Sequence, residues 1–293
     1  MSNSTINIGS RAIGDGQPCY IIGEIGINHN GSLDIAKNLI SVAKNAGCDA
    51  VKFQKRTVEI VYTPEELAKP RENPFGATNG DLKRGLEFGL EQYRKIDEFC
   101  EEMGLPWFAS CWDEPSVDFI SQFDVPCFKV ASASLTDDAL LRHTRAAGKP
   151  VLLSTGMSTI EEIDHAVEVL GKSDLVILHA TSTYPSNYDE LDLRVIPELR
   201  RRYGVPVGYS GHETGIASSV AAVALGACVV ERHITLERSM WGSDQAASLG
   251  PSGLTRLVRD TRLVEMAMGS GTKRVFDSEI PIMKKLRRVG GRA

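Results

Sequence analysis

The sequence predicts a (β/α)8 barrel of the TIM type, an α/β fold, preceded by a short β-hairpin. Three observations support this prediction. Eight short apolar runs alternate with helical patterns along the chain. The runs are continuously apolar, as expected for parallel strands that are buried on both faces. Many of them end in a polar residue, and in such barrels the reactive side chains gather at the carboxyl ends of the strands.

The hairpin is expected within residues 4–17, with a strand around Ile6–Ile8 and glycine-rich turns on either side of the second strand. Residues 1–17 would then cap the lower end of the barrel. The barrel strands are predicted at Cys19–Gly23, Ala50–Phe53, Trp107–Ser110, Cys127–Val130, Val151–Leu153, Leu175–Leu178, Val205–Gly208 and Cys228–Glu231.

Helical periodicity fills the intervals between these strands, and glycine follows six of the predicted helices, as is typical of a helix end. A doubly wound parallel sheet is the alternative architecture, but no GxGxxG motif follows the first strand. Residues 18–270 would form the barrel domain and 271–293 a short basic tail. The helices are predicted at Leu33–Ala46, Glu91–Met103, Ser116–Gln122, Asp137–Ala147, Thr159–Leu170, Asp192–Tyr203, Gly215–Leu225 and Pro251–Met268.

One connection is unusually long. Residues 55–90 follow the second strand and are rich in proline and glycine. Structureless loops longer than ~15 residues are uncommon in compact domains unless they are functional or disordered. Because this loop leaves the end of the barrel where the reactive residues are expected, we interpret it as a cover over the active site.

Composition excludes several classes of protein. The chain has 293 residues, 42% of them hydrophobic, and a net charge of −5 without a long basic block, so nucleic acid is not an expected partner. No apolar run reaches the ~20 residues that span a bilayer. The six cysteines form no CxxC pair or zinc framework, and the N-terminal residues lack the basic-then-apolar layout of a signal peptide, so we expect none. We therefore expect a cytoplasmic protein.

Two lysines and three serines indicate a phosphate site. Lys52 and Lys129 lie in the second and fourth strands, and Ser132, Ser154 and Ser210 follow or end strands. Lysine supplies a point charge and hydroxyls supply directional donors, a combination that suits phosphate. In the alternative interpretation, each lysine pairs with a carboxylate such as Glu24 or Glu231.

His212 and His233 follow adjacent predicted strands, so their imidazoles could bind one metal ion together with water, substrate or Glu24. A hydrogen-bonded histidine pair without a metal is the alternative, and His179 is a third candidate at this rim. Glu24 ends an apolar run, where an unpartnered carboxylate would be costly. Asn28 and Asn30 either face the site or cap the following helix.

The strand ends, taken together, resemble the sialic acid synthase family, which condenses phosphoenolpyruvate with an N-acylated amino sugar. The resemblance implies an acceptor like N-acetylmannosamine, either free or as its 6-phosphate, and a nine-carbon 2-keto sugar acid and phosphate as products. The similarity runs from about residue 18 to residue 280, and residues 75–88 resemble the family's cover loop. The matching motifs are Glu-Ile-Gly-Ile-Asn-His-Asn-Gly at 24–31, Val-Lys-Phe-Gln-Lys at 51–55, Phe-Lys-Val-Ala-Ser at 128–132, Ser-Thr-Gly-Met at 154–157, Tyr-Ser-Gly-His-Glu-Thr-Gly at 209–215, the run 220–235 and Gly-Ser-Asp at 242–244.

The resemblance implies a role for each matching position. His212 and His233 would bind a divalent metal, usually manganese, with magnesium or cobalt as alternatives. Glu24 and Glu231 would lie near the reacting carbons as catalytic residues, and Gln54, Tyr184 and Asp244 would contact the acceptor sugar. The phosphate of phosphoenolpyruvate would be held by Lys52, Lys129, Ser132, Ser154, Ser182 and Ser210.

Three departures from the family pattern limit what can be transferred. Ser134 stands where family members commonly carry an acidic residue, and Gln245 stands where animal relatives have histidine. The third is expected from the length of the sequence, which reaches only the end of the barrel: we expect no antifreeze-like domain, through which relatives form swapped dimers. Cys111, where threonine is frequent, is a smaller difference. A homodimer of barrels, or a separate protein supplying that domain, is therefore an expected partner.

Two other functions remain open on the sequence. One is a phosphoenolpyruvate-dependent synthase of another 2-keto-3-deoxy sugar acid. The other is a non-catalytic barrel that binds a sugar or an anion. The two lysines, two histidines and Glu24 favour an enzyme over the second alternative.

Overall fold

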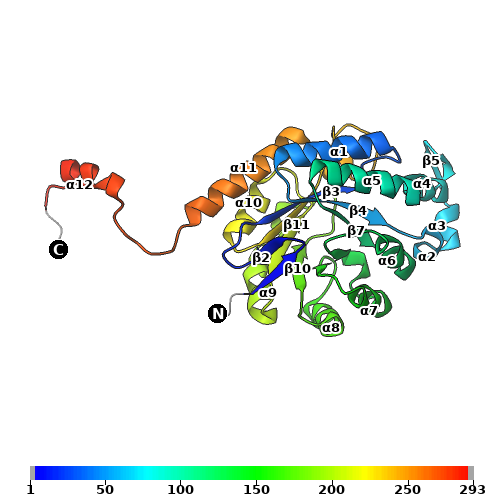
Figure 1. Ribbon diagram of the computed structural model, residues 1–293, viewed down its shortest axis with the longest axis horizontal. Helices are drawn as coiled ribbons and strands as arrows, with labels where there is room; N and C mark the ends of the chain where they lie inside the picture. Colours follow the sequence, from blue (N-terminus) through cyan, green and yellow to red (C-terminus); the bar gives the residue numbers. More distant parts are fainter. Residues whose placement is uncertain (1–3, 290–293) are drawn as a thin grey trace.

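The computed structural model describes residues 4–289, and at its centre eight parallel strands form a closed barrel surrounded by helices (Figure 1). Each strand pairs with the next along the chain, and the last pairs with the first. This confirms the (β/α)8 prediction and excludes an open doubly wound sheet. The strands are β3 (Tyr20–Gly26), β4 (Ala50–Lys55), β7 (Trp107–Cys111), β8 (Phe128–Val130), β9 (Val151–Ser154), β10 (Leu175–Ala180), β11 (Val207–Gly211) and β12 (Val229–His233).

The register of the strands decides which side chains point into the barrel. Glu24 is in register with Lys52, and His233 is in register with Glu24. Ser110 is in register with Lys129, and Ser210 with Glu231. Because partners in register share a face of the sheet, these side chains form one inward-facing set. The apolar members of the same set are fully buried below them: Ile22, Phe108, Leu152, Val176 and Leu178.

Helices cover the outside of the barrel, and their ends follow the capping rules. The side chains of Ser32, Asp113, Asp137 and Thr159 each accept a hydrogen bond from the first turn of the helix they precede. Gly47, Gly104 and Gly204 end their helices in the left-handed conformation. The helices are α1 (Leu33–Ala46), α5 (Leu90–Met103), α6 (Glu114–Ile120), α7 (Asp138–Ala146), α8 (Ile160–Leu170), α9 (Val195–Tyr203), α10 (Ala217–Ala224) and α11 (Pro251–Met268), with 3-10 turns at Ser132–Ser134, Tyr188–Glu190 and Gln245–Ala247.

The predicted hairpin is present as β1 (Thr5–Ile8) and β2 (Arg11–Gly14), paired antiparallel. Ile8 and Ile13 are buried in the main hydrophobic cluster. A Cβ atom built on Gly9 would lie 3.4 Å from Pro126, which precedes β8. The hairpin therefore packs at the amino-terminal end of the strands, away from the reactive residues. Residues 1–3 of the predicted cap lie outside the described part of the chain.

The long connection between β4 and α5 is folded, so the expectation of a structureless loop is wrong. It contains α2 (Val58–Val61), α3 (Pro64–Ala68), β5 (Pro70–Asn73), β6 (Gly76–Thr78) and α4 (Asn79–Leu86). We call residues 56–89 the β4–α5 excursion. It gathers at the end of the molecule opposite the amino terminus (Figure 1). Its short elements carry too little periodicity to be recognised one by one from the sequence.

Phe75, at the tip of the excursion, fixes it to the rim of the barrel. A Cβ atom on Gly85 would lie 2.1 Å from the Phe75 ring, and one on Gly31 would lie 2.9 Å from it. Glycine at these two positions therefore makes room for the aromatic side chain. The Phe75 ring also meets Trp241, with centroids 6.5 Å apart. The excursion is thus packed against the loops that follow β3 and β12.

Beyond α11 the chain runs to a 3-10 turn at Asp277–Glu279 and to α12 (Ile280–Leu286), which stands apart from the barrel (Figure 1). The tail therefore contains a helix that the sequence did not predict, and its side chains Ile282 and Leu286 are exposed. Residues 290–293 lie outside the described part of the chain. Within residues 4–289, no helix combines the length and the apolar character needed to cross a membrane.

Candidate active site

A cavity of about 260 Å³ opens at the carboxyl end of the barrel strands, near the lower end of the usual volumes of small-molecule sites. It brings together every residue predicted for the site except Asp244, which lies at its edge, with a carboxylate oxygen 3.7 Å from His233 Nδ1. The predicted residues that line the cavity are Glu24, Lys52, Gln54, Lys129, Ser132, Ser154, Ser182, Tyr184, Ser210, His212, Glu231 and His233.

Two lysines and two glutamates form the floor of this cavity. Glu231 lies between the lysines, 2.9 Å from Lys129 Nζ and 3.1 Å from Lys52 Nζ. Lys52 Nζ also lies 3.1 Å from Glu24 Oε2, and Gln54 donates a hydrogen bond to the other Glu24 oxygen at 2.9 Å. The pairing of lysines with carboxylates, the alternative interpretation from the sequence, is therefore present. Both ammonium groups nevertheless line the cavity, so the pairing does not exclude an anionic ligand.

Burial and mutual attraction set the protonation of these four groups. Burial raises the pKa of Glu24 to about 7, although Lys52 opposes this shift. Burial lowers the pKa of Lys129 to about 8, with Glu231 opposing. At Lys52, burial is outweighed by the two carboxylates and the pKa lies above its usual value. At Glu231, burial is outweighed by Lys129 and Lys52, which hold the pKa well below its usual range. Near neutral pH, Glu24 is therefore the group closest to exchanging a proton.

The serines converge on the turn after β9. A Cβ atom on Gly156 would lie 2.2 Å from Ser182 Oγ and 2.9 Å from Ser132 Oγ, so glycine allows both hydroxyls to approach the backbone here. The Gly156 amide donates a hydrogen bond to Ser132 Oγ at 3.0 Å. Ser154 Oγ is buried without a hydrogen-bond partner, whereas Ser210 Oγ donates to Glu231 at 3.1 Å. Hydroxyls and ammonium groups thus face one compact space that suits an anion.

The two histidines stand next to each other on the same wall. His233 is the last residue of β12, and His212 directly follows β11; their ring centroids are 5.5 Å apart. Burial lowers the pKa of both to about 3, reinforced at His212 by His233 and at His233 by Lys52. His212 Nδ1 lies 2.7 Å from the carbonyl oxygen of Thr181, a contact that requires this nitrogen to carry the proton and leaves Nε2 as a lone-pair donor.

Neutral imidazoles are suitable ligands for a divalent transition metal. The side chains at this wall are too few, however, to complete the coordination of such an ion. Both rings are neutral at pH 7, and His233 Nδ1 is buried without a hydrogen-bond partner. Within residues 4–289, no group of three or more histidine, cysteine, aspartate or glutamate side chains could enclose a metal ion. A metal at this wall would therefore take its remaining ligands from water or substrate, as open catalytic sites do.

Five residues that line the cavity were not predicted from the sequence, two of which are the small side chains Ala131 and Ala133. Ser110 accepts a hydrogen bond from Lys52 Nζ at 3.0 Å. Trp112 and Met157 also line the cavity, and Trp112 Nε1 is buried without a partner. The signal that could have found Ser110 is its place at the end of β7, two residues from the inward-facing Phe108. Its neighbour Cys111 points the other way, with its sulfur 3.5 Å from the carbonyl oxygen of Ser116.

His179 does not belong to this site, so its prediction as a rim histidine is wrong. It shares a register position with Tyr209, on the outer face of the strands, and its Nε2 lies 2.7 Å from the carbonyl oxygen of Leu191. Asn28 and Asn30 do not cap the following helix either; Ser32 does. Asn28 bonds to the Ile234 carbonyl group at 2.9 Å, and this contact ties two rim loops together.

The two departures near the acceptor side lie outside the cavity lining. Ser134 is buried in the 3-10 turn after β8. Gln245 donates a hydrogen bond to the Asn28 carbonyl oxygen at 3.3 Å and contacts Thr235, so its side chain joins the rim loops. Neither residue lines the cavity, so neither substitution alters the groups that do.

Comparisons with known proteins agree with this geometry. The NeuB family model matches residues 39–273. The chain is 43% identical to N-acetylneuraminate-9-phosphate synthase of Homo sapiens, over 94% of this chain and 78% of that protein. It is 36% identical to N,N'-diacetyllegionaminic acid synthase of Legionella pneumophila, over 98% of this chain and 83% of that protein. The crystal structure of N-acetylneuraminic acid (sialic acid) synthetase from Leptospira borgpetersenii matches with a TM-score of 0.86 and 30% identity, over 98% and 99% of the two chains.

Proposed function

The chain belongs to the NeuB family, and on that premise we propose that its barrel joins phosphoenolpyruvate to the aldehyde of an N-acylated amino sugar. The products are phosphate and, for a six-carbon acceptor, a nine-carbon 2-keto acid of the sialic acid type. The chain is thus an enzyme, a carbon–carbon bond-forming transferase. The observation that carries the proposal is the single cavity in which two lysines and a ring of serines face two neutral histidines.

Phosphoenolpyruvate takes the lysine side of the cavity. Its phosphate lies among Ser132, Ser154 and Ser182, and Lys129 and Lys52 balance its negative charges. Ser210 completes this set. Buried ammonium groups are effective here because the attraction between charges is stronger where water is excluded. Glu231 keeps both lysines protonated and in place before the substrate arrives.

The acceptor sugar takes the histidine side, with its aldehyde facing His212 and His233. A divalent cation held by these two imidazoles would act as a Lewis acid on the aldehyde oxygen. Manganese is the metal we expect. Gln54, Tyr184 and Asp244 surround this position and contact the sugar hydroxyls. The Tyr184 ring lies 4.2 Å from the His212 ring and provides a wall for the sugar chain.

The reaction proceeds by attack of C3 of phosphoenolpyruvate on the aldehyde carbon, which forms the new carbon–carbon bond. The aldehyde oxygen gains a proton and becomes a hydroxyl group. The positive charge left at C2 is quenched by water, and cleavage of the bond between C2 and the phosphate oxygen releases phosphate and leaves the 2-keto group. Lys52 and Lys129 stabilise the departing phosphate.

Glu24 is the residue that takes the proton from the attacking water. A general base works best when its pKa is near the operating pH, and burial brings the pKa of Glu24 to about 7. Lys52 and Gln54 hold its carboxylate in place. Glu231, whose pKa lies well below the usual range, stays ionised and positions the lysines.

The test is an assay of phosphate release from phosphoenolpyruvate and Mn²⁺ with a panel of aldehyde acceptors. Turnover with N-acyl hexosamines, abolished by a chelator and restored by Mn²⁺, supports the proposal. Mg²⁺ and Co²⁺ serve as comparison metals. Turnover only with other aldehydes would assign the chain to a different class of sugar-acid synthase. No turnover with any acceptor, combined with a ligand-induced rise in Tm, would favour a non-catalytic binding barrel.

A further inference from the structure

A buried arginine lies directly behind the barrel cavity, and the proposed mechanism does not use it. Arg56 is the first residue of the β4–α5 excursion, and its side chain is 4% exposed. It does not line the cavity, whereas Gln54 and Trp112, which it contacts, both do. Because a charged side chain is rarely buried without partners, the partners of Arg56 indicate what it does.

Three groups hold the guanidinium of Arg56 in place. Its central carbon lies 4.7 Å from the centre of the Trp112 ring. Its Nη2 donates a hydrogen bond to the side-chain oxygen of Gln54, and its Nη1 lies 3.8 Å from a carboxylate oxygen of Glu87. The other Glu87 oxygen accepts a hydrogen bond from the backbone amide of Arg56 at 3.2 Å. Arg56 thus joins the two ends of the excursion and contacts the wall of the cavity.

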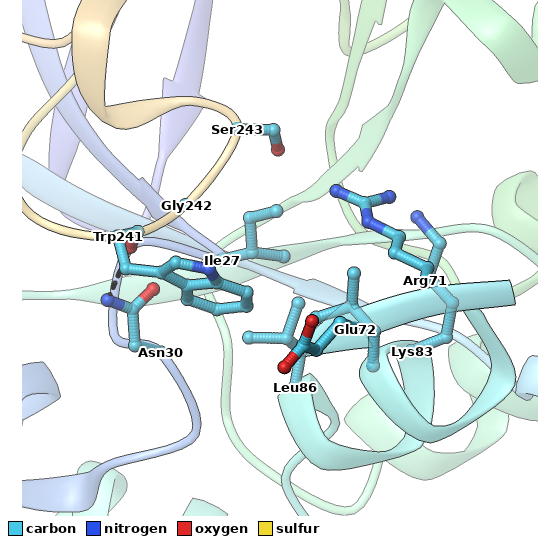
Figure 2. Close-up of a pocket in the computed structure, with 10 residues that line it drawn as sticks. Ile27, Asn30, Arg71, Glu72, Lys83, Leu86, Trp241, Gly242 and Ser243 are labelled. Atoms are coloured by element: carbon cyan, nitrogen blue, oxygen red, sulfur yellow. Dashed lines mark hydrogen bonds between the residues drawn. The ribbon is translucent and has the colours of Figure 1, made fainter. Parts of the chain in front are cut away.

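The end of the excursion that carries Glu87 is itself packed against the rim of the barrel. Leu86, the last residue of α4, lines a second pocket of about 300 Å³ together with Ile27 and Trp241 (Figure 2). Ile27 follows β3, and Trp241 belongs to the loop after β12. The rim loops therefore help to place Glu87, and through it Arg56.

Arg56 decides which way the Gln54 amide faces. An amide side chain has an acceptor oxygen and a donor NH₂ group, and its neighbours determine where each of them points. A guanidinium can only donate, so the Gln54 oxygen must face Arg56, and the NH₂ group then faces Glu24, to which it donates at 2.9 Å. The reverse orientation would set N–H groups against a cation and an oxygen against a carboxylate.

The hydrogen bond from Gln54 makes the two oxygens of Glu24 unequal. Oε1 accepts it, whereas Oε2 is buried without a hydrogen-bond partner and lies 3.1 Å from the ammonium group of Lys52. Burial raises the pKa of Glu24 to about 7, and Glu231 adds to this rise, whereas Lys52, the hydrogen bond from Gln54 and Lys129 oppose it. The oxygen that is free to take a proton is therefore Oε2.

We propose that Arg56 is a positioning residue, which holds the Gln54 amide as a donor to Glu24 and thereby keeps Oε2 as the oxygen that takes the proton. This inference rests on the proposed function, in which Glu24 deprotonates the attacking water. Arg56 does not line the cavity, so it acts through Gln54. The second N–H of the same amide stays available to the sugar.

The experiment measures kcat against pH for Arg56→Met, with phosphoenolpyruvate, Mn²⁺ and an N-acyl hexosamine saturating. Methionine cannot donate, so the Gln54 amide is free to turn, and Glu24 loses a hydrogen bond that stabilises its charged form. We expect the acidic limb of the profile to move up by about one pH unit. Because the ionised fraction of Glu24 at pH 7 then falls from about one half to about one tenth, kcat at this pH should fall about fivefold. The KM for phosphoenolpyruvate should stay unchanged.

Lys55→Met is the matched control. Lys55 is the neighbouring cation, and its ammonium group donates to Glu87 at 3.3 Å and to the Phe88 carbonyl oxygen at 3.1 Å rather than to the Gln54 amide. Its loss removes a positive charge from the same carboxylate, and the profile should stay that of the parent. Arg56→Lys keeps a donor and should restore most of kcat and the parent profile.

A second measurement does not depend on turnover. Carbon NMR titration of the Glu24 carboxyl group, assigned by its absence in Glu24→Gln, should give a higher pKa in Arg56→Met than in the parent. Gln54→Leu should raise this pKa by itself, and Arg56→Met should add nothing in that background, because Arg56 acts through the amide.

The outcomes separate this inference from the proposed function. An equal pKa of Glu24 in Arg56→Met and the parent, or a fall in kcat without movement of the pH profile, overturns the positioning role and leaves the proposed function standing. Absence of turnover by the parent with every acceptor overturns the proposed function. The NMR titration then still decides whether Arg56 acts on Glu24.

Discussion

Glu231 and Arg232 are neighbours on β12, both are buried and charged, and they point to opposite faces of the barrel wall. Glu231 faces the cavity and contacts two lysines. Arg232 faces the helices, where its guanidinium donates to Glu213 at 3.0 Å, to Ser219 at 2.9 Å and to the Gly215 carbonyl oxygen at 2.7 Å. We call Glu231, Lys52, Lys129 and the cavity-lining His233 the inner cluster, and Arg232, Glu213 and Ser219 the outer cluster.

The clusters differ in how completely their polar atoms are satisfied. In the outer cluster, Glu213 also accepts hydrogen bonds from the hydroxyls of Tyr209 and Ser219, and Arg232 Nε alone of the guanidinium nitrogens lacks a partner. Around the inner cluster, Ser154 Oγ and His233 Nδ1 are buried without hydrogen bonds, and the groups border a cavity. Burial of charge by itself therefore does not identify an active site. Buried polar atoms that lack hydrogen-bond partners and border a cavity do identify one.

If this contrast is correct, substitutions in the inner cluster remove activity and keep the fold. The largest effect is expected for His233→Ala, which should abolish metal-stimulated turnover, because His212 would be left as the only imidazole at the metal site. Steady-state assays with and without Mn²⁺ measure this. His143→Ala, at an exposed histidine that pairs with Asp118, is the control. Full activity of His233→Ala would remove that residue from the site.

Lys129→Ala should raise the KM for phosphoenolpyruvate by about a hundredfold, because a buried charged contact to the phosphate is lost. The Tm of this variant should stay close to that of the parent protein. Lys149→Ala is the matched control, since Lys149 pairs with Asp124 at the surface. An unchanged KM in Lys129→Ala would contradict the placement of the phosphate.

Arg232→Ala tests the other half of the comparison. It leaves Glu213 buried without its cation, and we expect the free energy of unfolding to fall by about 3–5 kcal/mol, measured by urea denaturation. The pair Arg232→Met/Glu213→Leu removes both charges and should recover much of this loss. If Arg232→Ala lost activity per folded molecule without losing stability, the outer cluster would have a direct catalytic role.

The smallest expected effect is a change in pH dependence at Glu24. Burial raises its pKa from 4.5 to about 7, so the folded state binds the proton more tightly than the unfolded state. Stability from this group is present below pH 4.5 and is lost as pH rises through 7. Relative to Glu24→Gln, the parent protein should therefore lose on the order of 1–3 kcal/mol between these pH values. Parallel pH–stability curves for the two proteins would contradict this.

Most of the fold and much of the site could be predicted from the sequence. Parallel strands buried on both faces appear as continuous apolar runs, so all eight barrel strands could be located, although seven of them extend further at the carboxyl end than predicted; β8 ends at Val130 as expected. Closure of the barrel then gathers the strand ends, which is why Lys52, Lys129, His212 and His233 meet in one cavity.

Two features were decided only by the tertiary structure. Side chains alternate along a strand, so a one-residue change in register reverses the face to which a residue points; register is fixed by pairing between strands distant in sequence. That is why His179 could not be distinguished from His212 in advance. The second feature is the excursion, whose short elements gain their conformation by packing Phe75 against the rim. No local pattern in the sequence encodes this contact, because Phe75 meets Gly31 and Trp241 only once the barrel has closed.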